Sequence, residues 1–310
     1  MTLQQIDGLY RQSEGLSSSN LKELLTSPAL YYAKFVAKTM PLKETYAMDF
    51  GTKVHAALLE PELFAKSFKA FPSYLALPAK DFASVKGRCQ WEPVDSSLVP
   101  DDGHTYFREA KSDDALKTQI DRLSEYYGME IITPNEQKVI ANLLEELKLN
   151  PQVDNLLQQK KSTEVVLRGN FDEIQLKGKL DAIIGDQVFD YKTCEHAIND
   201  ELILWTIKKY SYDLQAYFYL HLAKQNNLNV NGFTWVFQNK TTGQCAVVPC
   251  PEAILASGAK KFKLGLSIFD RCMATGIWAD FVDEHGNTNY DAPMDLTRKL
   301  DKVFGGINND

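Results

Sequence analysis

Apolar residues recur at helical spacing in the first half of the chain. Residues 17–38 begin with the polar run Ser17–Asn20, which suits a helix N-terminus, and continue with leucines that share one face. Pro28 interrupts this pattern, so we expect two short helices with a break before the proline. Further helices are predicted over residues 51–59 and 134–148, the second of which begins with a proline.

The second half of the chain mixes strand and helix patterns. Residues 163–192 are rich in strand-forming residues, and a helix is expected from about residue 201 to 225. Strands at 230–238 and 244–249, joined by a Thr-Thr-Gly turn, form the next predicted hairpin. A long helix over residues 252–274 closes the pattern.

Two segments lack regular periodicity. Residues 72–112 carry many Pro, Gly, Asp and Ser residues, which predicts a long irregular excursion. The end of the chain, Gly305–Asp310, is expected to fray. The order of the remaining elements predicts an α/β fold, with a central mixed β-sheet flanked by helices, in a single domain over residues 1–310.

Composition narrows the class of protein. Hydrophobic residues make up 44% of the chain and charged residues 24%, as in ordinary globular proteins. No apolar run approaches the roughly 18 residues of a membrane span, and the N-terminus does not resemble a secretory signal, so we expect a cytoplasmic protein without membrane contact. The net charge of -7 argues against a protein that merely coats DNA. The same charge neither favours nor disfavours a nuclease. The five cysteines form no CxxC pair, which gives a zinc site little support.

A predicted hairpin carries the candidate chemistry. Gly185 and Asp186 separate two apolar runs and suit a two-residue turn of type II′. Such a turn places Asp181 opposite Asp190 on the paired strand. Both faces of the hairpin are otherwise apolar, which is typical of a sheet covered on both sides.

Two carboxylates opposed in a partly buried place require a compensating cation. A divalent metal ion suits oxygen ligands, and Lys192 projects on the same face as Asp190 because the two are two residues apart on a strand. This combination suits metal-assisted hydrolysis of a phosphodiester, in which the lysine orients or deprotonates the attacking water. The alternative from the hairpin alone is a surface element in which Lys192 or Lys179 forms an ordinary salt bridge.

The hairpin and two companion motifs resemble a known superfamily. Asp181 followed by Asp190-Tyr-Lys192 is similar to the central motif of PD-(D/E)xK nucleases. The segment Gly51–His55 resembles the G-x-x-x-H helix of the RecB-like branch, and Gln215 and Tyr219 resemble that branch's Q-x-x-x-Y helix. Within this branch, residues 16–31, 48–61 and 132–157 look like the RecE (exonuclease VIII) C-terminal nuclease family, with a resemblance that covers about residues 16–275.

The resemblance implies a restriction-endonuclease-like core and roles for particular residues. The implied metal ligands are His55, Asp181, Asp190 and the carbonyl oxygen of Tyr191. The implied catalytic residues are Asp181, Asp190, Lys192, Gln215 and Tyr219. Glu164 is a further acidic candidate, and the pair Lys208 and Lys209 is the basic cluster that we expect to contact phosphate.

The resemblance also implies an activity. Members of the RecE family act as 5′-to-3′ exonucleases on double-stranded DNA ends with Mg²⁺, and we expect that Mn²⁺ can substitute for Mg²⁺. They work beside a single-strand annealing recombinase in phage-type DNA recombination, and they form ring-like homo-oligomers. The alternatives are a related endonuclease or single-strand nuclease, and a non-catalytic DNA-binding module on the same fold.

Overall fold

The computed structural model describes residues 2–42, 45–70, 75–78, 104–107, 124 and 128–280. The chain divides into two compact units, residues 1–18 with 43–260 and residues 19–42 with 261–310. The single domain expected over residues 1–310 stays a prediction. Most of the excursion expected at residues 72–112 lies outside the described residues, as does the C-terminal tail. The described part of the excursion contains two antiparallel strands, β2 (Leu75–Pro78) and β3 (His104–Phe107).

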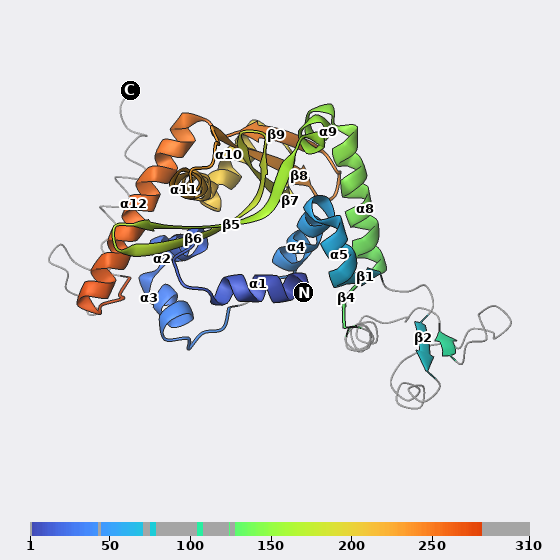
Figure 1. The fold of residues 1–310 in the computed structure, drawn as a ribbon, viewed down its shortest axis with the longest axis horizontal. Coiled ribbons are helices and arrows are strands. Elements are labelled where there is room, and N and C mark those ends of the chain that lie inside the picture. The colour runs from blue at the N-terminus through green and yellow to red at the C-terminus, as the bar shows by residue number, and fades with distance from the viewer. Residues whose placement is uncertain are drawn as a thin grey trace, which may run out of the picture. The chain divides into compact units, whose positions relative to one another are not determined.

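The larger unit is built on a five-stranded sheet in the order β5-β6-β7-β8-β9 (Figure 1). The strands are β5 (Lys161–Phe171), β6 (Ile174–Ile184), β7 (Gln187–Cys194), β8 (Gly232–Asn239) and β9 (Cys245–Pro249). Neighbouring strands are antiparallel except for β7 and β8, which are parallel. The prediction of a central mixed sheet flanked by helices is confirmed.

The β6–β7 hairpin has the predicted turn. Gly185 has a φ of +59°, whereas Asp186 is not among the residues with positive φ, which fits a type II′ turn. Ladder pairing runs from the turn to Ala182 and Phe189 and ends there. Asp181 and Asp190 therefore occupy the first position beyond the paired region, where the two strands begin to separate. The two residues are not ladder partners, which differs from the predicted pairing.

One face of the sheet packs against helices from the first half of the chain. These are α1 (Leu3–Gln12), α4 (Tyr46–Leu59), α5 (Pro61–Ser67), α8 (Pro134–Leu149) and α9 (Pro151–Gln158). Val54 of α4 and Leu143 of α8 are fully buried in one apolar cluster with Phe189 and Tyr191 of β7. Beside them, β1 (Phe68–Ala70) pairs in parallel with β4 (Glu130–Ile132). Burying Phe189 and Tyr191 here turns the alternate residues of β7 to the opposite face.

That opposite face is covered by α11 (Tyr212–Gln225), which follows α10 (Asp200–Lys209). The single helix expected over residues 201–225 is wrong, because Ser211 has a φ of +49° and the chain bends there. Helix α11 lies close against β6 at Gly178, where an added Cβ atom would be 2.7 Å from Leu222 and 3.3 Å from Tyr219. A residue without a side chain at position 178 therefore permits this close packing.

The smaller unit contains parts of two long helical segments. Helices α2 (Ser18–Thr26) and α3 (Pro28–Tyr31) are separated at Ser27, so the predicted break before the proline is confirmed. A π-helix, η1 (Tyr32–Val36), continues α3. The last described helix is α12 (Glu252–Thr275), which begins in the larger unit. Within the smaller unit, Tyr31 stacks on Trp278 with ring centroids 5.5 Å apart. No helix among the described residues is long and apolar enough to cross a membrane.

Candidate active site

The centre of the site is a buried acid and a lysine on β7. Asp190 has no exposed surface, and its Oδ2 atom lies 2.6 Å from Nζ of Lys192. The two side chains share a face because they are two residues apart on the strand. The alternative of a surface hairpin, in which Lys192 forms an ordinary solvated salt bridge, does not fit the burial of Asp190.

The second oxygen of Asp190 is held by helix α11. Nε2 of Gln215 donates to Oδ1 of Asp190 at 3.0 Å, and the same nitrogen lies 3.4 Å from the hydroxyl of Tyr219. Gln215 and Tyr219 are one helical turn apart, so both face β7 and β6. The amide therefore fixes the orientation of the carboxylate relative to the sheet.

Asp181 and His55 meet β7 from the other direction. The pairing of β6 with β7 ends at Ala182 and Phe189, so the main-chain N–H and C=O groups of Tyr191 that face β6 contact side chains instead. The amide of Tyr191 donates to Oδ2 of Asp181 at 3.0 Å, and Nε2 of His55 lies 2.7 Å from the carbonyl oxygen of Tyr191. Nδ1 of His55 is 3.3 Å from Oδ2 of Asp181. An imidazole, a carboxylate and a peptide oxygen thus converge at the fork between the strands.

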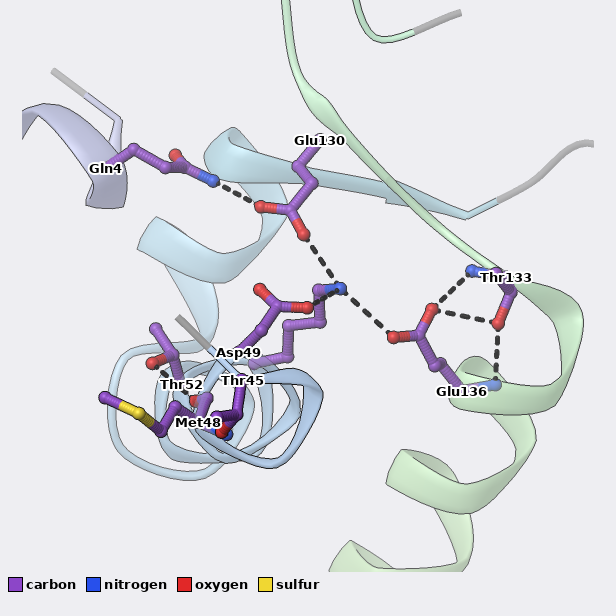
Figure 2. A network of polar contacts seen from close by, with 9 residues as sticks. Gln4, Thr45, Met48, Asp49, Thr52, Glu130, Thr133 and Glu136 are labelled. Carbon is purple, nitrogen blue, oxygen red and sulfur yellow. Dashed lines mark hydrogen bonds and ion pairs between the residues drawn. The ribbon is translucent and has the colours of Figure 1, made fainter. Parts of the chain in front are cut away.

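Helix α4, which carries His55, is fixed by a buried ammonium group. Nζ of Lys53 lies 2.8 Å from Asp49, 2.8 Å from Glu130 and 3.1 Å from Glu136, and Figure 2 shows these three carboxylates converging on it. Glu136 also closes a capping box with Thr133 at the start of α8. One cation therefore joins α4, β4 and α8, and it sits two residues before the histidine.

Burial and neighbouring charges set the ionisation of the two β7 groups. Burial raises the pKa of Asp190 to about 6, against the opposing effect of the Lys192 ammonium, and the nearby Asp181 raises it further. Burial lowers the pKa of Lys192, but the Asp190 and Asp181 carboxylates outweigh burial and hold that pKa above its ordinary value. Lys192 is therefore a cation in this arrangement, which suits a group that neutralises negative charge.

Glu164 lies beside the site on β5. It occupies the position opposite Asp181, between the pairs Thr163–Ala182 and Val165–Leu180, and its φ of +50° interrupts the ladder. Its carboxylate forms an ion pair with Lys179, which also contacts Asp7 of α1 at 2.6 Å. Burial raises the pKa of Glu164 to about 7 despite this lysine.

The donors at the fork suit a divalent ion. An imidazole nitrogen of His55 lies 2.7 Å from the Tyr191 carbonyl oxygen, and the other nitrogen of the ring lies 3.3 Å from the Asp181 carboxylate, so nitrogen and oxygen donors of the kind that would hold a divalent ion lie together. Oδ2 of Asp190 is buried and makes no hydrogen bond of normal geometry among the described residues, although the Lys192 ammonium is near it. Within that same set of residues, no three acidic, histidine or cysteine side chains already form a metal-binding cluster. Two features account for this. One expected ligand is a main-chain oxygen, and the Asp190 carboxylate points towards Lys192 and Gln215.

Comparison with known proteins places the fold. A family described as "PDDEXK-like domain of unknown function (DUF3799)" matches residues 17–285. The chain belongs to this family. Its membership confirms the predicted PD-(D/E)xK superfamily, whose nucleases are typically dependent on divalent metal ions. The narrower resemblance to RecE nucleases stays a prediction.

A solved structure supports the same fold for this PDDEXK-like chain. The chain is similar to the crystal structure of a protein from Eubacterium rectale named "Putative exonuclease", with a TM-score of 0.54 and 13% sequence identity. The match covers 94% of each chain. No curated protein matches the sequence. Family and fold together support a nuclease.

The structure brings the predicted site residues together. His55, Tyr191, Asp181, Asp190 and Lys192 gather around the strand fork, and Gln215 and Tyr219 support Asp190 from α11. Sequence reasoning missed the anchoring role of Lys53 and the contribution of α1 through Asp7. The position of Lys53, four residues after Asp49 on the helix that carries the histidine, was a usable signal for the first. Sequence spacing carried no signal for the second.

Proposed function

We propose that this PDDEXK-like protein is a metal-dependent exonuclease that hydrolyses phosphodiesters of linear double-stranded DNA. The observation that carries the proposal is the fork between β6 and β7. There, Asp181 and His55 meet the main chain of Tyr191 next to the buried pair of Asp190 and Lys192. Oxygen and imidazole donors beside a buried cation suit the cleavage of an anionic substrate.

Four groups would hold the divalent ion: the side chains of His55, Asp181 and Asp190 and the carbonyl oxygen of Tyr191. When bound, such an ion polarises the phosphodiester and increases the acidity of water. Lys192, which carries a raised pKa and a positive charge, stabilises the negative charge that develops on the phosphate during cleavage. In this role the lysine orients the phosphate and neutralises its charge.

Gln215 acts through Asp190. By donating to Oδ1, it leaves Oδ2 as the oxygen that is available to an ion and to Lys192. Tyr219 backs the amide from the next turn of α11 and is itself buried. Both residues are positioning residues, because Gln215 acts through the acid and Tyr219 through Gln215.

Several finer features of the activity come from the RecE resemblance and are part of the proposal. They are 5′-to-3′ polarity, Mg²⁺ as the ion with Mn²⁺ as a substitute, a role in phage-type DNA recombination, a ring-like homo-oligomer and an annealing recombinase as partner. An exonuclease requires a DNA end, so closed circular duplex is expected to resist the enzyme while linear duplex of the same sequence is degraded.

The deciding experiment measures degradation of end-labelled linear duplex with Mg²⁺ and with a chelator. Asp190→Ala and Lys192→Ala are expected to abolish the Mg²⁺-dependent products without loss of the folded state. Asp186→Ala is the matched control, because this aspartate lies in the exposed turn of the same hairpin. Full activity in either site variant would exclude the mechanism.

The two alternatives give different results in the same assay. Cleavage of closed circular duplex, or of single strands alone, would indicate an endonuclease or a single-strand nuclease with the same site. DNA binding without cleavage, together with no heat of Mn²⁺ binding in calorimetry, would indicate a non-catalytic module.

A further inference from the structure

The outer face of α10 is unusually apolar for a surface helix. Its inward residues, Ile203 and Ile207, are buried as expected of an amphipathic helix. The outward face nevertheless carries Leu204 and Trp205, which are 55% and 48% exposed, and Tyr210 follows the helix at 48% exposed. Contiguous exposed apolar residues of this size mark interaction sites more often than ordinary surface.

A lysine lies across the two exposed rings. Nζ of Lys209 is 4.3 Å from the ring centroid of Trp205 and 5.1 Å from that of Tyr210. Together with Lys208, it also stabilises the C-terminal end of α10, which accounts for two lysines there but not for the exposed aromatic residues. We call Leu204, Trp205, Lys208, Lys209 and Tyr210 the α10 surface.

The α10 surface is continuous with the active site. Tyr210 stacks on Tyr212 with ring centroids 5.7 Å apart, and Nζ of Lys192 lies 5.1 Å from the ring centroid of Tyr212. Lys192 in turn contacts Asp190. An unbroken series of ring and cation contacts therefore runs from the exposed tryptophan to the group that neutralises the phosphate.

We propose that the α10 surface binds the unpaired nucleotides at the end of the DNA substrate, with bases stacked on Trp205 and Tyr210. The proposal rests on the proposed function and names the part of the substrate that this surface receives. Aromatic faces beside lysines are the combination that binds single-stranded DNA, because bases stack on the rings and phosphates pair with the cations. A contact between an exposed lysine and a ring is weak, so Lys209 can exchange the rings for a phosphate when a base stacks.

The test is the binding of a labelled single-stranded oligonucleotide and of duplexes with and without an unpaired overhang. Fluorescence anisotropy is measured with Ca²⁺ in place of Mg²⁺, using the full chain. Trp205→Ala and Tyr210→Ala are each expected to raise the Kd for the single strand and the overhang duplex by about fivefold or more, the factor of one lost stacking contact. The Kd for blunt duplex is expected to change less.

Three controls separate binding from folding. Tyr46→Ala removes a ring outside the surface that is more exposed still, at 64%, and is expected to leave binding unchanged. Trp205→Phe is expected to retain most of the affinity while losing the quenching of tryptophan fluorescence that base stacking produces. Circular dichroism and thermal unfolding verify that each variant is folded.

Absence of single-strand binding by the unaltered protein, or unchanged Kd values in both alanine variants, would overturn this proposal. Either result can coexist with Asp190-dependent cleavage of linear duplex, which would leave the proposed nuclease intact. Conversely, loss of binding in Trp205→Ala without any metal-dependent cleavage by the unaltered protein would support the surface and exclude the nuclease.

Discussion

Nε2 of His55 lies 2.7 Å from the carbonyl oxygen of Tyr191, a main-chain atom of the neighbouring sheet. This contact joins a helix to a strand through a peptide oxygen, which no substitution of the tyrosine side chain removes. The side chain of Tyr191 points into the core instead, where its hydroxyl donates to Gln238 at 2.5 Å. The position of the helix relative to the strand therefore determines the proposed ion site as much as the identities of the ligands do.

His55→Ala is expected to weaken Mn²⁺ binding at least about tenfold, because it removes the imidazole donor from the fork. Isothermal titration calorimetry measures the affinity, and circular dichroism verifies the fold. Thr52→Ala on the same helix is the control and is expected to bind Mn²⁺ like the unaltered protein. Equal affinity in the histidine variant would contradict the assignment of this donor.

Gln215→Leu is expected to lower kcat by about 10- to 100-fold, the usual effect of removing a group that orients a metal ligand. The leucine leaves Oδ1 of the buried Asp190 without its amide donor, so the carboxylate loses its fixed orientation. Tyr219→Phe is the milder comparison, because the 3.4 Å contact of its hydroxyl is long. Steady-state kinetics on linear duplex compare the two, and a larger defect in the phenylalanine variant would reverse the assigned roles.

Lys53→Met is expected to lower the free energy of unfolding by about 3–5 kcal/mol, because it leaves the buried carboxylate of Glu136 without its cation. Glu136 is the most affected of the three carboxylates that contact Lys53, since its side chain is only 5% exposed. Asp49→Asn is the matched control with an expected loss under about 1 kcal/mol, because the Asp49 side chain is 38% exposed. Urea denaturation measures both, and similar values for the two variants would argue against a buried anchor.

Glu164→Gln is expected to flatten the dependence of stability on pH. The pKa of Glu164 is raised from 4.5 to about 7 in the folded state, chiefly by burial, so between these values the folded protein binds more protons than the unfolded chain. Stability contributed by this carboxyl therefore falls as the pH rises from about 4.5 to 7. Thermal melts at intervals across this range measure the slope, with Glu173→Gln in the exposed β5–β6 turn as control. An unchanged slope in the Glu164 variant would contradict the shift.

Gly258→Ala is expected to destabilise the larger unit by about 1–3 kcal/mol through overpacking. A Cβ atom at Gly258 would lie 2.1 Å from the carbonyl oxygen of Asp213, a main-chain atom of α11 that cannot rotate away. Gly8→Ala in α1 is the control of opposite sign, because a Cβ there meets nothing within 4 Å and alanine favours helix. Chemical denaturation of both variants measures the difference. Equal stability would mean that the contact between α11 and α12 is not close.

Local signals in the sequence were sufficient for the hairpin. Glycine at position 185 suits the positive φ of the turn, and the two-residue period of a strand predicted that Phe189 and Tyr191 share one face, as they do in the apolar cluster. The relation of Asp190 to Lys192 followed from the two-residue period of a strand alone. The helix expected over residues 201–225 was wrong because Ser211, a residue without a strong preference for positive φ, bends the chain there.

The sequence by itself determined the fold class, the turn and the candidate group of Asp181, Asp190 and Lys192, because each depends on residue type and short-range periodicity. The other candidate residues came from the family resemblance. Only the tertiary structure decided that β6 and β7 separate beyond Ala182, which turns the main chain of Tyr191 towards Asp181 and His55. The anchoring of α4 by Lys53 was decided in the same way. The physical reason is that the contacts of His55 and Lys53 join elements far apart in the chain, and their positions depend on how the helices pack on the sheet.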